Sequence, residues 1–374
     1  MTFLFAGLLI ILSFIKKNSK FVLALLTTYT FIMTVYANNI PDLEVYRSNY
    51  YYGGKISEPL YVLGAGVFKS LGFDYTIYRG ALCLGAIFLL ASTFYEISPS
   101  PNIVFSMYLL YPLCYDAVQI RTFVSNAFVI LSIRFVYRYL KDKKSINIVY
   151  FFISVLLGTG FHYTAIMFSI LALCFFDMRK YQVIFWMVIP AVLGMTLLSF
   201  SHLMPMISNF ISNTDRMERY IVGENKKSLI GLIGLFVPRI AYIVFFLFVS
   251  NIQKSPQYYN KRNMALLTIK NNYNESVEDN TKFVINVFTG VCYIFEFTIL
   301  EITIAEDYER LIRVAITLCC ILVSIILDRT KKDASNLMYI FLFVLQMSFL
   351  LGTLLSMHDV EGVFIPFMNS NLIL

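Results

Sequence analysis

Charged residues are scarce in this chain of 374 residues. Only 14% of the residues are charged, whereas soluble domains average about 25%. The mean hydropathy is +0.70, and apolar runs recur along nearly the whole length. This composition excludes an ordinary soluble enzyme and indicates an all-α, polytopic integral membrane protein that forms one domain over residues 1–374.

Several common site signatures are missing as well. The six cysteines all lie inside apolar runs without CxxC spacing, which is typical of small buried side chains rather than of a metal or redox site. The sequence contains no GxxxxGK[ST], GxGxxG or HExxH motif. We therefore expect no cofactor, no metal, no nucleic acid partner and no nucleotide site on the cytoplasmic side.

About twelve apolar segments are candidate transmembrane helices, although 146–160 and 162–176 are short against the roughly 20 residues that a crossing needs. They cover residues 2–15, 21–37, 79–97, 101–115, 121–140, 146–160, 162–176, 182–200, 229–250, 283–304, 310–327 and 336–356. The segment Pro59–Phe73 is apolar but shorter than the roughly 20 residues of a crossing, and it contains Lys69. For this segment we expect a short re-entrant or interfacial helix. Gly158 and Gly160 permit a tight turn, so we expect 146–176 to form a hairpin.

The lysines predict how these segments are oriented. If all of them cross, the connections KKNSK, KDKK, DMRK and DRTKKD share one side with the loop 251–282. By the positive-inside rule, that side is the cytoplasm. The loops 38–78 and 201–228 then face outside, as do both termini.

The predicted outer face is richer in arginine than in lysine. It carries Arg47, Arg79, Arg121, Arg216, Arg219, Arg310 and Arg313. Arginine binds phosphate or carboxylate through two parallel hydrogen bonds and stays charged when partly buried. The alternative is that these side chains extend from helix ends to lipid headgroups.

The outer loop 38–78 begins with a polar, aromatic segment that holds several candidate binding residues. They are Asp42, Tyr46, Arg47, Tyr50 and Glu58. Tyrosine rings suit sugar stacking and hydrogen bonding to hydroxyl groups, but tyrosine is also enriched where helices meet the membrane surface. From the residues alone, both interpretations of this loop stay open.

Other candidates lie where apolar segments begin or end. Arg121 opens one segment and could simply pair with the nearby Asp116. His162 stands between two segments and could be a base, a hydrogen-bond donor to substrate or a satisfied interfacial side chain. Arg219, Tyr220 and Arg310 lie among acidic residues, as solvated helix ends also would. Arg313 differs because it lies inside an apolar segment, where a charge is costly and often functional.

Taken in order, these motifs resemble a known family. The spacing Asp-x3-Tyr-x3-Tyr at Asp42, Tyr46 and Tyr50 is followed by EPLY, then by IRTFVSNAF, and then by FH with T-A-I. This order resembles the EpsG/Wzy-like polysaccharide polymerases of bacterial capsule and exopolysaccharide assembly. The resemblance is dense over residues 40–170 and continues with ERY at 218–220 and RVA at Arg313. The chain departs from the family pattern at Thr122, where these proteins often carry glutamine.

The resemblance implies a GT-C-like, lipid-carrier-dependent glycosyltransferase in the bacterial cytoplasmic membrane, with its active site facing outside. Such an enzyme transfers the growing glycan from undecaprenyl diphosphate to the nonreducing end of a new undecaprenyl-diphosphate-linked repeat unit. The implied partners are these lipid-linked oligosaccharides, membrane lipids, a flippase and a chain-length regulator. A lipid-linked oligosaccharide flippase, a glycan ligase and an acyltransferase of the same pathway are the alternatives.

The resemblance also implies roles for the candidate residues. Arg121 and Arg313 are expected to hold the diphosphate, with Arg47 or Arg219 assisting, and Glu58 or His162 is expected to act as the base. The expected substrate-binding residues are Asp42, Tyr46, Arg47, Tyr50, Arg219, Tyr220 and Arg310.

Overall fold

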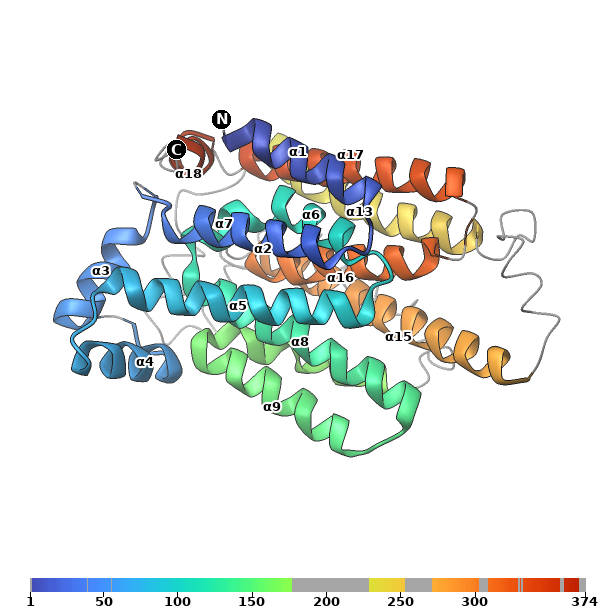
Figure 1. Ribbon diagram of the computed structural model, residues 1–374, viewed down its shortest axis with the longest axis horizontal. Coiled ribbons are helices and arrows are strands. Elements are labelled where there is room, and N and C mark those ends of the chain that lie inside the picture. Colours follow the sequence, from blue (N-terminus) through green and yellow to red (C-terminus); the bar gives the residue numbers. More distant parts are fainter. Residues whose placement is uncertain are drawn as a thin grey trace, which may run out of the picture.

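Long helices running side by side form the body of the molecule in the computed structural model (Figure 1). The structure describes residues 2–38, 40–54, 56–176, 229–252, 271–302, 309–328, 330, 332–356 and 360–369. All regular structure in these ranges is helical, and none of these residues lies in a β-strand. The predicted all-helical fold class is therefore confirmed.

The elements follow the chain in the order of their labels. They are α1 (Thr2–Ile15), α2 (Lys20–Val35), α3 (Leu43–Tyr52), α4 (Pro59–Ser70), α5 (Tyr75–Ile97), α6 (Pro101–Leu110), α7 (Leu113–Val118), α8 (Ile120–Asp142), α9 (Ile146–Phe161), the 3-10 helix η1 (Tyr163–Phe175), α13 (Leu229–Ile252), α15 (Asn271–Ile302), α16 (Glu309–Leu327), α17 (Lys332–Ser356), the π-helical turn η5 (Val360–Phe364) and α18 (Ile365–Asn369).

Four of the described helices are long and apolar enough to cross a membrane. These stretches are Tyr75–Ile97, Ile120–Asp142, Arg310–Leu327 and Lys332–Leu355. Large apolar side chains on their outer surfaces are exposed, as Phe88 and Leu351 illustrate, which is expected where lipid covers a helix. Each predicted segment except 182–200, which lies outside the described residues, coincides with a helix or a pair of helices. Twelve crossings stay a prediction, because several of these helices are shorter than a full span.

Local sequence signals explain where several helices begin. The side chain of Asp74 accepts a hydrogen bond from the amide of Ile77 at 2.9 Å and so caps the start of α5. Pro59 occupies the first turn of α4, where its missing amide proton costs nothing. The 12-residue α4 buries only Tyr61. It agrees in length with the short helix that the sequence predicts for Pro59–Phe73, and its place in the membrane stays a prediction.

Two connections, the turn between α9 and η1 and the segment between α13 and α15, bear on the predictions from the sequence. The chain reverses at His162, and η1 packs against α9, so the predicted hairpin over 146–176 is present. The connector predicted over 251–282 is shorter, because α13 extends to Ile252 and α15 already begins at Asn271. The segment 271–282 is polar, and a hydropathy pattern does not detect a helix that continues beyond the apolar layer.

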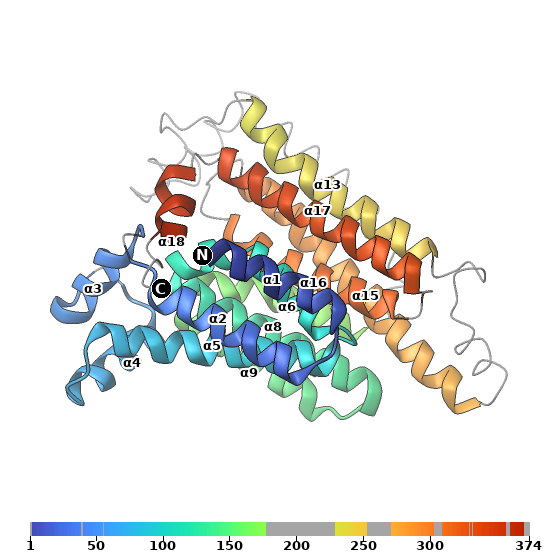
Figure 2. The ribbon, with the colours of Figure 1, turned by 45° about the horizontal axis from the view of Figure 1, so that its top comes forward.

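The described helices give the molecule two distinct ends. The start of α1, the short helices α3 and α4, and α18 gather at one end, on the left in Figure 1. The turns after α1, after α8 and before α17 lie at the other end (Figures 1 and 2). We call the first the arginine end, after Arg121 and Arg310, and the second the lysine end, after Lys17, Lys143 and Lys332. This arrangement agrees with the predicted alternation of the connections.

Helix α16 lies at the centre of the described bundle. It packs against α15, α6, α13 and α8, and nearly all of its residues are buried. All six cysteines are free and buried, as expected for small core side chains. Because α16 begins at the arginine end, it carries Arg310 and Arg313 from that end toward the core.

Candidate active site

An ion pair between a partly buried arginine and a buried glutamate joins α8 to the residue that precedes α4. Nη1 of Arg121 lies 2.5 Å from Oε2 of Glu58. The guanidinium also lies over the ring of Tyr46, with its Cζ 5.5 Å from the ring centroid. Glu58 is only 6% exposed, so the carboxylate is shielded from water on most sides. Within the described part of the chain, Nε of Arg121 is buried and donates no hydrogen bond. This nitrogen is therefore a spare donor beside the pair.

Contacts with the α9–η1 turn fix the position of Glu58. The hydroxyl of Tyr163 donates a hydrogen bond to the carbonyl of Ser57 at 3.0 Å. Leu60 packs directly on Gly160, and a Cβ atom at Gly160 would come within 2.5 Å of the Leu60 side chain. The glycine that permits the turn thus also lets α4 approach α9 closely.

His162 lies in this turn and contacts an arginine from the central helix. Its Nε2 is 3.3 Å from Nη1 of Arg310, and its Nδ1 is 2.8 Å from Oγ1 of Thr164. Arginine has no acceptor, so Nε2 must accept in this contact. The backbone N–H of Thr164 also points to Nδ1, with its nitrogen 3.4 Å away, so both ring nitrogens of His162 have partners.

The pair of Arg121 with Glu58 and the pair of Arg310 with His162 both lie near Tyr46. Burial raises the pKa of the Tyr46 phenol, while Arg121 and, more weakly, Arg310 oppose that shift. Both guanidinium groups therefore act on the same phenol, which stays protonated at neutral pH. The structure thus brings together Glu58, Arg121, His162, Arg310 and Tyr46 from five separate segments. We call these five residues the arginine-end cluster.

Arg313 lies one helical turn deeper than Arg310 and belongs to a different group. Its Nη1 is 3.2 Å from Oδ1 of Asp116, and both side chains are almost fully buried, with exposures of 3% and 1%. Asp116 also accepts hydrogen bonds from the hydroxyl of Tyr108 at 2.6 Å and from the amide of Asn126 at 3.5 Å. The alternative in which Asp116 pairs with Arg121 is not what the structure shows, because Arg121 pairs with Glu58 and Asp116 pairs with Arg313.

The other predicted binding residues do not join these ion pairs and hydrogen bonds, although the charge of Asp42 also raises the pKa of the Tyr46 phenol. Asp42 is exposed at the start of α3, and the exposed Arg47 pairs with Glu44 one turn away on the same helix. Tyr50 is buried, stacks on Tyr78 and donates a hydrogen bond to the carbonyl of Phe73 at 2.8 Å. Arg219 and Tyr220 fall outside the described residues.

Arg79, one of the arginines predicted on the outer face, is buried and binds backbone carbonyls of neighbouring segments. It is 3% exposed, and it donates hydrogen bonds to the carbonyls of Ala37 at 2.9 Å and Ala117 at 3.2 Å. These bonds tie the end of α2 and the end of α7 to the start of α5. Lysine has no planar pair of donors with which to bridge two carbonyls, so even Arg79→Lys is expected to disturb the packing.

Sequence reasoning missed the buried network of Tyr108, Asp116 and Asn126. The available signal was an aspartate inside an apolar stretch, which requires a buried partner. The sequence does not show that this partner comes from Arg313, 197 positions further along the chain. Among the residues that the structure describes, no group of three His, Cys, Asp or Glu side chains is placed to hold a metal ion.

The long apolar helices define a helical membrane protein. A family model described as the EpsG family matches residues 20–369, nearly the whole chain, and the protein belongs to this family. This membership makes it a membrane protein of the polysaccharide polymerase type. Comparisons with curated proteins and with solved structures found no match.

Proposed function

We propose that this protein polymerises lipid-linked oligosaccharide repeat units for a capsular or extracellular polysaccharide. The donor is a growing glycan on undecaprenyl diphosphate, and the acceptor is a new repeat unit on the same carrier. The reaction takes place at the outer face of the cytoplasmic membrane. The observation that carries this proposal is the arginine-end cluster, in which two arginines face a carboxylate and an imidazole.

The chemistry requires two functions, and the cluster offers groups for both. A hydroxyl oxygen at the nonreducing end of the acceptor attacks the anomeric carbon of the donor. A glycosidic bond forms, the bond between that carbon and the diphosphate oxygen breaks, and undecaprenyl diphosphate leaves. A positively charged group must lie next to the diphosphate oxygen that becomes negative as it leaves. A base must also take the proton of the attacking hydroxyl.

Arg121 and Arg310 are suited to hold the diphosphate. Both lie at the arginine end, and Arg121 keeps a donor nitrogen, Nε, that is not used in the described contacts. We therefore assign the clamp to these two residues. Arg313, for which the family resemblance implied a clamp role, is enclosed with Asp116, and we propose that it holds α16 in place instead. Glu58 and His162 remain the two base candidates, because each lies against one of the clamp arginines.

The proposal predicts a specific defect in cells that lack the protein. Single lipid-linked repeat units should accumulate and should reach the outer leaflet, because only the linking step is lost. Their exposure can be measured with a glycosidase added to intact cells, followed by extraction of the lipid fraction. Units that stay inaccessible to the glycosidase would favour a transport function and contradict the proposal.

A further inference from the structure

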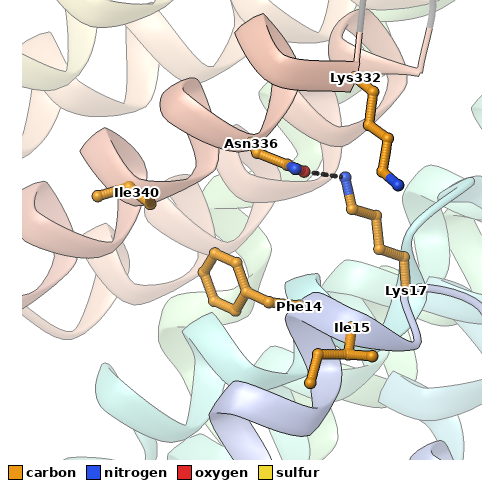
Figure 3. A pocket seen from close by; sticks show the side chains of 6 residues that line it. All are labelled: Phe14, Ile15, Lys17, Lys332, Asn336 and Ile340. Atoms are coloured by element: carbon orange, nitrogen blue, oxygen red, sulfur yellow. Dashed lines mark hydrogen bonds between the residues drawn. The ribbon is translucent and has the colours of Figure 1, made fainter.

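The lysine end carries an open hollow between α1 and α17 (Figure 3). Its volume is about 720 Å³. The residues that line it are Phe14, Ile15, Lys17, Lys332, Asn336 and Ile340. Lys17 lies in the turn after α1, whereas Lys332 opens α17. Two cationic side chains from distant parts of the sequence thus share one site.

The amine of Lys17 is held in position within this hollow. Its Nζ donates a hydrogen bond to Oδ1 of Asn336 at 2.8 Å and lies 4.8 Å from the centroid of the Tyr339 ring. Figure 3 shows the side chain of Lys17 extended toward Asn336, with Lys332 beside it. The amide group of Asn336 keeps its own N–H donors for another partner.

Positive charge is in excess at this position. Partial burial and the nearby ammonium of Lys332 lower the pKa of Lys17, and the opposing effect of Asp328 is smaller. An ammonium that is both partly desolvated and repelled by a second cation gains from a bound anion. A phosphate group, which accepts several hydrogen bonds, matches these donors.

The remaining lining is apolar, and two of its side chains lie on the exposed surface of the bundle. Ile15 and Ile340 are 67% and 53% exposed, and Phe14 lies between Ile340 and the two lysines in Figure 3. A free phosphate ion would leave these side chains uncovered, whereas an acyl chain attached to the phosphate would cover them. Basic pockets between transmembrane helices on the cytoplasmic side are known binding sites for anionic lipid headgroups.

We propose that Lys17, Lys332 and Asn336 bind the headgroup phosphate of an anionic phospholipid, with an acyl chain lying over Phe14, Ile15 and Ile340. The lipid belongs to the leaflet at the lysine end, so it is distinct from the substrate of the arginine-end cluster. This inference does not depend on the polymerase activity.

The full chain, purified in a mild detergent, can be tested by native mass spectrometry and thermal unfolding with added lipid. Phosphatidylglycerol should bind more tightly and raise the Tm more than phosphatidylcholine with the same acyl chains. The variant with Lys17→Gln and Lys332→Gln should bind phosphatidylglycerol about 30-fold more weakly, since each lysine near a membrane surface contributes on the order of a fivefold gain. The exposed Lys332→Gln change alone should weaken binding about fivefold.

Lys16→Gln is the matched control, because Lys16 is the exposed neighbour of Lys17 and does not line the hollow. It should bind phosphatidylglycerol like the wild type. Equal binding of both lipids by the wild type, or equal losses in Lys16→Gln and Lys332→Gln, would overturn the proposal in favour of general charge attraction. Equal stabilisation by inorganic phosphate without lipid would overturn the acyl-chain contact.

Discussion

Arg121→Lys separates a catalytic role of Arg121 from a role in membrane anchoring. The ammonium of lysine can still pair with Glu58 and can still reach lipid headgroups, so the positive charge and the topology are retained. The planar guanidinium, its contact with the Tyr46 ring and the spare Nε donor are lost. The loss of one donor at a developing oxyanion lowers a rate by about 100-fold to 1000-fold.

Arg121→Lys should change the free energy of unfolding only modestly. A cation–π contact in a partly buried place contributes about 0.5–2 kcal/mol, and the ion pair with Glu58 is retained. Arg121→Lys should therefore accumulate in the membrane at nearly normal levels, with a modestly lower Tm. High-molecular-weight polysaccharide should fall to about one hundredth of the wild-type amount or less in a complementation assay at matched protein levels.

Arg138→Lys is the matched control for this experiment. Arg138 lies on the same helix, α8, near the lysine end, and it also pairs with a glutamate, Glu96, at 2.5 and 2.8 Å. Arg79→Lys would be a poor control, because Arg79 bridges two buried carbonyls. Normal polymer from Arg138→Lys and little from Arg121→Lys is the expected result. Normal polymer from Arg121→Lys would refute the assignment of the clamp.

Two other substitutions test how the site is held in place. Asp116→Asn leaves the Arg313 guanidinium buried without its counter-ion, which should cost about 3–5 kcal/mol of stability and lower the Tm in detergent. Replacing both residues, Asp116→Leu with Arg313→Met, should recover most of this loss. An unchanged Tm in Asp116→Asn would contradict the buried pair. Gly160→Ala places a methyl group against Leu60 and should displace α4 and Glu58, so the polymer yield should fall about 10-fold to 100-fold. Adding Leu60→Ala to the same protein should restore the yield. Full activity of Gly160→Ala alone would show that the exact position of α4 does not matter.

The sequence predicted most of the helices because apolar length and lysine position report directly on membrane helices. It also predicted Glu58, Arg121, His162 and Arg310 as site candidates, and the structure brings these residues to one place. It did not predict which groups pair. The choice between Glu58 and Asp116 as the partner of Arg121 depends on how α4 packs against α9, and no local pattern encodes that contact. The buried state of Arg313 likewise depends on the central position of α16, which follows from the packing of several helices.

The pair between Arg313 and Asp116 also limits how the protein can move. If α16 slid along its axis by one turn, about 5.4 Å, both buried charges would lose their partners. We therefore expect α16 to keep its position along its axis and to hold Arg310 in one place. Helix α4, by contrast, buries only Tyr61 among its own residues and has no such buried charge pair within its described length. If the protein polymerises lipid-linked repeat units as proposed, we therefore expect α4 to shift when a bulky sugar enters, while Arg313 and Arg310 on α16 stay in place.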